Sequence, residues 1–276
     1  MNKCFRDCDI CAATPVAPKG TQQLSCTSYA CQTIDSPNPF ARFAHRSRLR
    51  KSLALALSRI GPGSKVLDYG CGSGIFVSAL LALNSDAVGY EPFKEERCKP
   101  ALPVFSRLQD VEALGPYDVI TLLETIEHLH DHEIDEFLRL SERVLRPGAG
   151  VLISAPIEIG PALLLKELSR YLRAPSGRLR GPFDHSAGEL LKAAFLGISA
   201  RRAENIKIAH RGFDFRRAIE YIREKGWRVQ VLSHGPLPIG GWYGNSQVFL
   251  WASRPGSAAT PLRINWHRAS AAGRAK

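Results

Sequence analysis

Residues Val66–Phe76 read Val-Leu-Asp-Tyr-Gly-Cys-Gly-Ser-Gly-Ile-Phe, and this stretch decides the fold. A short apolar segment, typical of a buried strand, runs into three glycines at alternate positions, and an apolar helical pattern follows. Gly70 and Gly72 allow backbone angles that a β-carbon disfavours, and they let a ligand lie against the main chain. The stretch therefore predicts a strand–turn–helix unit with a nucleotide-sized pocket at the end of a parallel strand.

The glycine spacing separates two classes of ligand. Dinucleotide folds usually carry Gly-x-Gly-x-x-Gly, so that a pyrophosphate rests on the N-terminus of the next helix. Here Gly70, Gly72 and Gly74 are spaced Gly-x-Gly-x-Gly, and Asp68 precedes them. A carboxylate repels a pyrophosphate but suits a ligand with an ammonium and a sulfonium group. The segment resembles motif I of class I S-adenosylmethionine (SAM)-dependent methyltransferases.

The resemblance covers roughly residues 40–254 and implies a SAM site at the carboxyl edge of a sheet. Glu91 ends an expected strand about 20 residues beyond the glycine turn, where a carboxylate can bind ribose hydroxyls. In the family, an acidic residue at the place of Asp110 often meets the adenine amino group, although Asp110 can also be an exposed helix-capping residue. The cofactor-binding residues expected here are Asp68, Gly70, Cys71, Gly72, Gly74, Glu91, Asp110 and Glu124.

Strands and helices alternate from Lys65 onward, which predicts a parallel sheet with helices on both faces. The expected strands are 66–69, 87–90, 103–105, 117–123 and 150–154, and the expected helices are 40–60, 75–83, 94–99 and 133–144. A helix over 213–225 precedes two strands, 227–233 and 246–252, joined by a glycine-rich connection. The prediction is an α/β, Rossmann-like fold with a seven-stranded, mostly parallel sheet and an antiparallel C-terminal hairpin.

Three parts of the chain differ in composition. Residues 1–38 form a cysteine-rich N-terminal segment, residues 39–254 form the expected methyltransferase domain, and residues 255–276 form a basic tail that we expect to be disordered. Within the domain, residues 157–209 are a long insertion. We expect it either to cover the acceptor as a lid or to pack on the sheet as a helical pair without touching substrate.

Five of the seven cysteines lie within the first 31 residues, which in a cytosolic chain favours metal binding over disulfides. Four of them could bind one tetrahedral zinc ion: Cys8, Cys11, Cys26 and Cys31. The segment resembles a degenerate form of the zinc-ribbon-like segment that precedes the catalytic domain in many bacterial methyltransferases. Unligated thiols are the alternative, and an iron–sulfur cluster on Cys4, Cys8 and Cys11 is a third.

Residues 124–132 place six titratable side chains in nine positions directly after the expected strand 117–123. The run resembles the Glu-x-x-Glu-His segment of quinone-biosynthesis O-methyltransferases and of RNA 2′-O-methyltransferases. Some members of both groups use this segment to hold a divalent cation.

Three interpretations of this run stay open. In the first, Glu124, Glu127 and His128 bind a magnesium-like or zinc-like ion, which would lower the pKa of a substrate hydroxyl. The fourth ligand would come from Asp184, His185 or His210. In the second, His128 acts alone as the catalytic general base. In the third, the residues only organise the loop over the cofactor.

The net charge of +11 favours anionic partners, such as nucleic acid, acidic small molecules or an anionic membrane surface. A plain solvated basic surface is the alternative. No apolar run approaches the roughly 20 residues of a membrane span, so we expect no transmembrane segment. The N-terminus lacks an apolar signal region, and we therefore expect a cytoplasmic protein.

The sequence predicts a SAM-dependent methyltransferase that acts at oxygen on a small-molecule or lipid-linked acceptor. The expected cofactors are SAM and, where the metal interpretations hold, zinc and magnesium. The alternatives are an enzyme like RNA 2′-O-methyltransferases, a nicotinamide-dependent oxidoreductase, and a non-enzymatic scaffold that binds a partner through its cysteines.

Overall fold

The computed structural model describes residues 39–255, except 62, 84, 94–101, 172–184, 208 and 238. The chain divides into two compact units, Met1–Arg46 and Ser47–Lys276, and the fold below is that of the second. Of the first unit, only the beginning of helix α2 (Pro39–Leu57) is described. The cysteine-rich segment, the expected helix over 94–99 and the basic tail beyond residue 255 lie outside the described residues.

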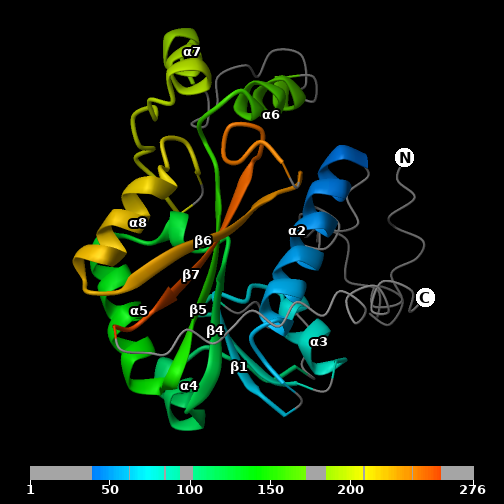
Figure 1. Ribbon diagram of the computed structural model, residues 1–276, viewed down its shortest axis with the longest axis vertical. Helices are drawn as coiled ribbons and strands as arrows, with labels where there is room; N and C mark the ends of the chain where they lie inside the picture. The colour runs from blue at the N-terminus through cyan, green and yellow to red at the C-terminus, as the bar shows by residue number, and fades with distance from the viewer. Residues whose placement is uncertain are drawn as a thin grey trace, which may run out of the picture. The chain divides into compact units, whose positions relative to one another are not determined.

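A seven-stranded sheet with the order β3-β2-β1-β4-β5-β7-β6 forms the centre of the second unit (Figure 1). Neighbours among β1 to β5 pair in parallel, whereas β7 is antiparallel to both β5 and β6. This confirms the predicted Rossmann-like fold with its antiparallel C-terminal pair. The strands are β1 (Lys65–Tyr69), β2 (Asp86–Tyr90), β3 (Val104–Phe105), β4 (Tyr117–Leu123), β5 (Leu145–Pro156), β6 (Arg228–Gly235) and β7 (Gln247–Ser253).

Strand β1 lies where the strand order reverses, because β2 and β4 flank it on its two sides. Open α/β sheets bind their ligands beyond the carboxyl ends of the strands at such a point. The glycine turn follows β1, Glu91 follows β2 and Glu124 follows β4. The topology therefore brings three of the predicted site segments to one edge of the sheet.

Helices cover both faces of the sheet (Figure 1). Helix α3 (Ile75–Leu81) and the part of α2 from Ser47 onward line one face, with Val77, Leu80 and Trp251 in the core. Helices α4 (Leu108–Leu114), α5 (Asp131–Val144) and α8 (Phe215–Glu224) line the other face. Since both faces are covered, the central strands are apolar runs rather than alternating ones, as parallel strands usually are.

The long insertion contains two described helices, α6 (Ala162–Tyr171) and α7 (Ala187–Leu196). The two helices contact each other, and Gly160 N, just before α6, donates a hydrogen bond to Ala193 O of α7 at 2.9 Å. None of the described helices has the length and apolar character needed to cross a membrane.

Most element boundaries lie within three residues of the sequence prediction, and three differences have a clear physical reason. Strand β5 begins at Leu145 rather than at residue 150, because the segment expected to separate helix from strand is an irregular start of the strand, where Gly148 has a φ of 83°. Helix α5 begins two residues early, since Glu133 Oε2 accepts a hydrogen bond from His130 N at 2.8 Å and caps its first turn. Helix α4 was not expected, because seven residues give too short a periodic pattern.

Candidate active site

The glycine turn after β1 has a left-handed backbone at each of its three glycines, with φ of 74°, 53° and 73° at Gly70, Gly72 and Gly74. A Cβ on Gly70 would lie 2.6 Å from the Thr125 side chain, and one on Gly74 would lie 2.9 Å from Leu102. A Cβ on Gly72 would meet nothing within 4 Å. Packing therefore requires the first and third glycines, whereas the middle glycine borders open space.

Glu91, at the tip of β2, is tied to this turn. Its carboxylate accepts hydrogen bonds from Gly72 N at 3.0 Å and from Phe93 N at 3.1 Å. Each carboxylate oxygen has a second lone pair that can accept a further donor. The open backbone at Gly72 and the Glu91 carboxylate thus lie together, as a nucleoside with ribose hydroxyls requires.

Asp68 lies beneath the turn rather than at its surface. Its side chain is buried, and its Oδ1 accepts a hydrogen bond from Thr121 Oγ1 of β4 at 2.6 Å. Burial, opposed by this hydrogen bond and assisted by the negative charge of Glu91, raises the pKa of Asp68 to about 7. The structure therefore gives Asp68 the role of joining β1 to β4 below the turn.

Cys71 and Asp110 flank this region. The Cys71 thiol lies over Gly89, where a Cβ would come within 2.5 Å of the sulfur. Asp110 lies in the first turn of α4, whose N-cap is Arg107, so its carboxylate complements the helix dipole without being the cap residue.

Glu124, directly after β4, has a φ of 51° and is the non-glycine residue with positive φ among the described residues. Its carboxylate forms an ion pair with the Arg48 guanidinium and accepts hydrogen bonds from Gln247 Nε2 and, at 3.1 Å, from Ser154 Oγ. These partners lie on α2, β7 and β5. The Glu124 carboxylate therefore contacts these elements and is not part of the group formed by Glu127 and His128, which follow it in the sequence. A strained backbone of this kind is common at functional sites.

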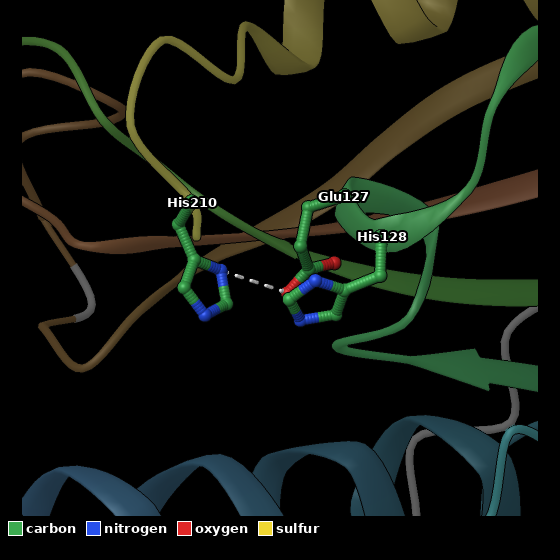
Figure 2. A group of neighbouring side chains, drawn as sticks. All are labelled: Glu127, His128 and His210. Atoms are coloured by element: carbon green, nitrogen blue, oxygen red, sulfur yellow. Dashed lines mark ion pairs between the residues drawn. The ribbon is translucent and has the colours of Figure 1, made fainter. Parts of the chain in front are cut away.

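Glu127, His128 and His210 come together into one cluster (Figure 2). Glu127 and His128 belong to a single 3₁₀ turn, Ile126–His128, and His210 reaches them from the segment before α8. Their ligand atoms all lie within 4.8 Å of one another, and His210 Nδ1 is 3.3 Å from Glu127 Oε1. The two imidazole rings are in edge contact, with 4.7 Å between their centroids. The structure thus joins two of the predicted ligands to His210.

The Glu127 carboxylate is fully buried, and neither of its oxygens accepts a hydrogen bond from the part of the chain that the structure describes. Burial and then the negative charge of Glu124 raise the pKa of Glu127 above its ordinary value. His128 Nδ1 lies 2.7 Å from Ile206 O, and because a carbonyl only accepts, Nδ1 must carry the proton. The remaining nitrogen, Nε2, then has a lone pair for a cation or a proton.

His185, the other predicted ligand that is described, lies elsewhere. Its buried ring faces Glu167 of α6, with Nδ1 3.8 Å from Oε1, and it is outside the cluster of Glu127, His128 and His210. His130 and His132, which belong to the run over residues 124–132, are exposed and stack on each other.

Sequence reasoning missed the cations that hold this region together. Arg202 donates to the main-chain oxygen of Glu127 and places its guanidinium 5.2 Å from the centre of the Phe213 ring. Glu158, fully buried after β5, pairs with Lys166 of α6. An acidic residue at the end of an apolar strand was a usable signal for Glu158, as it was for Glu124. No local pattern pointed to Arg202.

Residues 40–194, more than half of the chain, match the family model described as a methyltransferase domain. The chain belongs to the methyltransferase-domain family. This family agrees with the methyltransferase domain that the sequence predicts.

Two curated relatives share one name with each other. A ubiquinone biosynthesis O-methyltransferase from Methylococcus capsulatus is 32% identical over 127 residues, which are 42% of this chain and 49% of that protein. One from Chromobacterium violaceum is 28% identical over 156 residues, which are 51% of this chain and 64% of that protein. The methyltransferase therefore spans about half to just under two thirds of the length of these relatives.

Among solved structures, the methyltransferase is similar to 1,6-didemethyltoxoflavin-N1-methyltransferase from Burkholderia thailandensis, which was solved with bound S-adenosylhomocysteine. The TM-score is 0.47 at 15% identity, over 75% of this chain and 78% of that one.

Proposed function

We propose that this chain transfers the methyl group of SAM to a hydroxyl oxygen of a small-molecule or lipid-linked acceptor. The observation that carries the proposal is the cluster of Glu127, His128 and His210 at the sheet edge that also bears the glycine turn. The names of the curated relatives, O-methyltransferases of ubiquinone biosynthesis, support oxygen as the acceptor atom.

The glycine turn and Glu91 would hold SAM. Gly72 presents open backbone, and the Glu91 carboxylate retains capacity for ribose hydroxyls. Asp110, Cys71 and Glu124 border the same edge and complete the proposed cofactor site. Bound SAM supplies a methyl group already activated on a sulfonium, so the protein mainly aligns the acceptor oxygen and removes its proton.

The cluster would act on the acceptor hydroxyl by holding a divalent cation. The buried Glu127 carboxylate has no hydrogen-bond donor among the described residues, and a cation would compensate its charge. His128 shows the arrangement usual for a metal-binding histidine, in which the second ring nitrogen donates to a main-chain carbonyl. Two imidazoles with one carboxylate suit Zn²⁺ better than Mg²⁺. A bound cation lowers the pKa of a hydroxyl that contacts it.

A second candidate role for the cluster is general base catalysis by His128 without a cation. The hydrogen bond to Ile206 O leaves Nε2 as the proton acceptor, and this tautomer favours the role directly. In this role, a proton on His210 would compensate the negative charge of the buried Glu127 carboxylate. Measuring whether the cluster binds a cation distinguishes this role from the metal-binding one.

Cofactor binding is tested by calorimetric titration with S-adenosylhomocysteine beside a reduced nicotinamide dinucleotide. We expect binding of the first alone. We also expect Glu91→Gln to weaken that binding by on the order of tenfold, because one charged acceptor for the ribose is lost. Binding of the nicotinamide dinucleotide instead would overturn the proposed activity.

Cation binding is tested on chelator-treated protein by titration with Zn²⁺ and with Mg²⁺. His210→Ala should weaken Zn²⁺ binding by at least about 100-fold, because losing a ligand costs more than the roughly 10- to 100-fold loss caused by removing an outer-shell partner. His132→Ala is the matched control, since His132 is exposed and outside the cluster, and it should leave binding unchanged. Equal affinity in His210→Ala and the unaltered chain would contradict the cation site and leave His128 as the base.

The cysteine-rich segment is a second proposed zinc site, so the titration needs a companion variant. Cys8→Ser with Cys11→Ser should remove one zinc per chain from the purified protein and leave the His210-dependent binding intact. Unchanged zinc content in that double variant would rule out zinc on the N-terminal cysteines.

The acceptor is tested by transfer of labelled methyl from SAM into a cell extract. We expect the label in a small-molecule or solvent-extractable lipid fraction, and we expect ribonuclease treatment to leave it unchanged. Label that ribonuclease releases would instead establish RNA as the acceptor.

A further inference from the structure

Part of the chain between α7 and α8 supplies two contacts to the cluster, although its described residues belong to no helix or strand. Ile206 O accepts the hydrogen bond from His128 Nδ1 at 2.7 Å. His210 Nδ1 lies 3.3 Å from Glu127 Oε1 (Figure 2). We call residues 202–211, which are described except for 208, the return loop. Since no regular element fixes the return loop, its own contacts must set where these two residues lie.

The two ends of the return loop are fastened to each other. Ala203 N donates a hydrogen bond to Arg211 O at 3.1 Å. Directly beyond these ends, a Cβ on Gly212 would lie 2.5 Å from Arg201 O, so the two chain segments are in close main-chain contact. These contacts fix the ends of the loop relative to each other, but they do not fix the loop relative to the 3₁₀ turn Ile126–His128.

Arg202 joins the return loop to that turn. Its Nη2 donates to the main-chain oxygen of Glu127, and its guanidinium lies 5.2 Å from the centre of the Phe213 ring. Phe213 is buried, and its N–H donates to His210 O at 3.0 Å. One guanidinium therefore contacts Glu127 at one side of the cluster and, at the other side, the residue that is bonded to His210.

The contacts of Arg202 are partly shielded from water. Burial lowers the pKa of Arg202, and the negative charges of Glu127 and Glu158 oppose this shift. A further contact ties the return loop to α5, where Lys207 Nζ lies 2.6 Å from the Glu133 carboxylate, but the Lys207 side chain is exposed. Because an exposed ion pair contributes little and a shielded, charge-assisted hydrogen bond contributes more, Arg202 is the stronger tie.

We propose that Arg202 is a positioning residue for the cluster. By fixing the return loop on the 3₁₀ turn, it keeps Ile206 O against His128 Nδ1. It also keeps His210 against Glu127. Both candidate roles of the cluster, cation binding and general base catalysis, need the lone pair that this arrangement leaves on His128 Nε2. The consequence for methyl transfer rests on the proposed function, whereas the positioning itself does not.

The alternative is that Arg202 only supplies positive charge beside two buried carboxylates, those of Glu127 and Glu158. A lysine would supply the same charge. It lacks the planar guanidinium, whose separate N–H groups can bond the Glu127 oxygen while the plane lies against Phe213. Arg202→Lys therefore separates positioning from charge compensation, and Arg202→Met removes both.

The deciding measurement is the tautomer of His128 in chelator-treated full-length protein. It is read from the chemical shifts of the ring nitrogens at about pH 8.5, where an ordinary histidine is neutral. We expect the proton on Nδ1 in the unaltered chain. Arg202→Met and Arg202→Lys should both give a mixture of the two tautomers, because the Ile206 carbonyl no longer selects one of them. Neither a cation nor SAM takes part, so this result is independent of the proposed function.

The second measurement is the affinity of the His210-dependent site for Zn²⁺. Arg202→Met and Arg202→Lys should each weaken it by roughly 10- to 100-fold, the loss that follows removal of an outer-shell partner. Arg201→Met is the matched control, because Arg201 is the preceding arginine and is exposed. It should leave the tautomer and the affinity unchanged. S-adenosylhomocysteine binding shows that each variant is folded.

The tautomer of His128 decides the proposal. A proton that stays on Nδ1 in Arg202→Met would overturn it, and so would a mixture in Arg201→Met. A mixture in Arg202→Met that Arg202→Lys reverses would reduce Arg202 to a source of charge and would also overturn it. If the unaltered chain binds no Zn²⁺ but both Arg202 variants give the mixture, the cation site is wrong and the positioning role stands.

Discussion

The proposed site has two halves: the cofactor half, which is the glycine turn with Glu91, and the acceptor half, which is Glu127, His128 and His210 with the segments that hold them. The residues of the cofactor half lie close together in the sequence, whereas the acceptor half collects its residues from distant segments. The glycine turn is formed mainly by β1, α3 and the tip of β2, and its glycines have left-handed backbone angles, although Gly70 also packs against Thr125 after β4. The cluster instead depends on the segment before α8, which must reach back to the turn after β4. We infer that the acceptor half is more sensitive to changes far from its own side chains.

The two halves also treat buried carboxylates differently. The side-chain partner of Asp68 is neutral, the Thr121 hydroxyl, and burial raises the pKa of Asp68 despite this hydrogen bond. In the acceptor half, the buried Glu158 pairs with Lys166, and the half-buried Arg202 lies near both Glu127 and Glu158. Because a charge that loses its partner inside a protein is costly, cations stabilise the acceptor half more than the cofactor half.

The largest effect is expected at Gly212, two residues beyond His210. Gly212 has a φ of 73°, and a Cβ there would lie 2.5 Å from Arg201 O and 2.6 Å from Ala200 O. Main-chain atoms cannot rotate away, so Gly212→Ala should lower the free energy of unfolding by about 4 kcal/mol. It should also abolish cation binding by moving His210. Urea unfolding and Zn²⁺ titration measure the two effects.

Gly226→Ala is the matched control for this change. Gly226 has a φ of 85°, but a Cβ there would meet nothing within 4 Å. Only the cost of placing alanine in a left-handed backbone conformation remains, about 1 kcal/mol of unfolding free energy. If both substitutions cost the same, the main chain around Gly212 is not crowded, and the claimed sensitivity of the acceptor half is wrong.

The next effect is a pH dependence in the cofactor half. The pKa of Asp68 is raised from 3.8 to about 7, so the folded chain retains a proton that the unfolded chain releases between these values. The cost of burying the charged form therefore grows from about pH 4 to about pH 7 and is constant above. Asp68→Asn removes the charge and should stabilise the fold near pH 8 but hardly near pH 4, by less than the roughly 4 kcal/mol to which the pKa shift corresponds.

Denaturant unfolding at several pH values measures this difference. Asp86→Asn serves as the control, because Asp86 is an exposed carboxylate on the neighbouring strand β2. It should change stability by less than about 0.5 kcal/mol at each pH. A stability gain of Asp68→Asn that is the same at low and high pH would mean that burial does not shift this carboxyl group.

The parts of the fold with strong local signals could be predicted from the sequence. Strand β4 matches its predicted bounds, Tyr117–Leu123, because a short, mostly apolar run with β-branched residues follows a Gly-Pro turn. Helices α6 and α7 could not be delimited, because they leave several large apolar side chains exposed and so lack a clean polar face. The start of β5 was missed because an Arg-Pro-Gly segment normally separates elements rather than opening a strand.

The same division holds for the site. The titratable run after β4 was visible, but nothing local showed that Glu124 faces Arg48 while Glu127 faces His210. The bond that fixes the tautomer of His128 reaches Ile206, 78 positions away. Such contacts depend on how the insertion returns to the sheet, and a single sequence contains no periodicity that reports this path.

The smallest predicted effect concerns a local signal inside the acceptor half. Ser186 Oγ accepts a hydrogen bond from Glu189 N at 3.3 Å, and Ser186 N donates to Glu189 Oε2 at 3.0 Å, which forms the capping box of α7. Ser186→Ala should cost about 1 kcal/mol of unfolding free energy and increase hydrogen exchange in the first turn of α7. Ser106→Ala, an exposed serine that is not an N-cap residue, should cost less than about 0.5 kcal/mol. A loss far above 1 kcal/mol would show that α7 is held by its cap rather than by its packing on α6. The contrast between a locally encoded cofactor half and a distantly assembled acceptor half would then have to be given up for this helix.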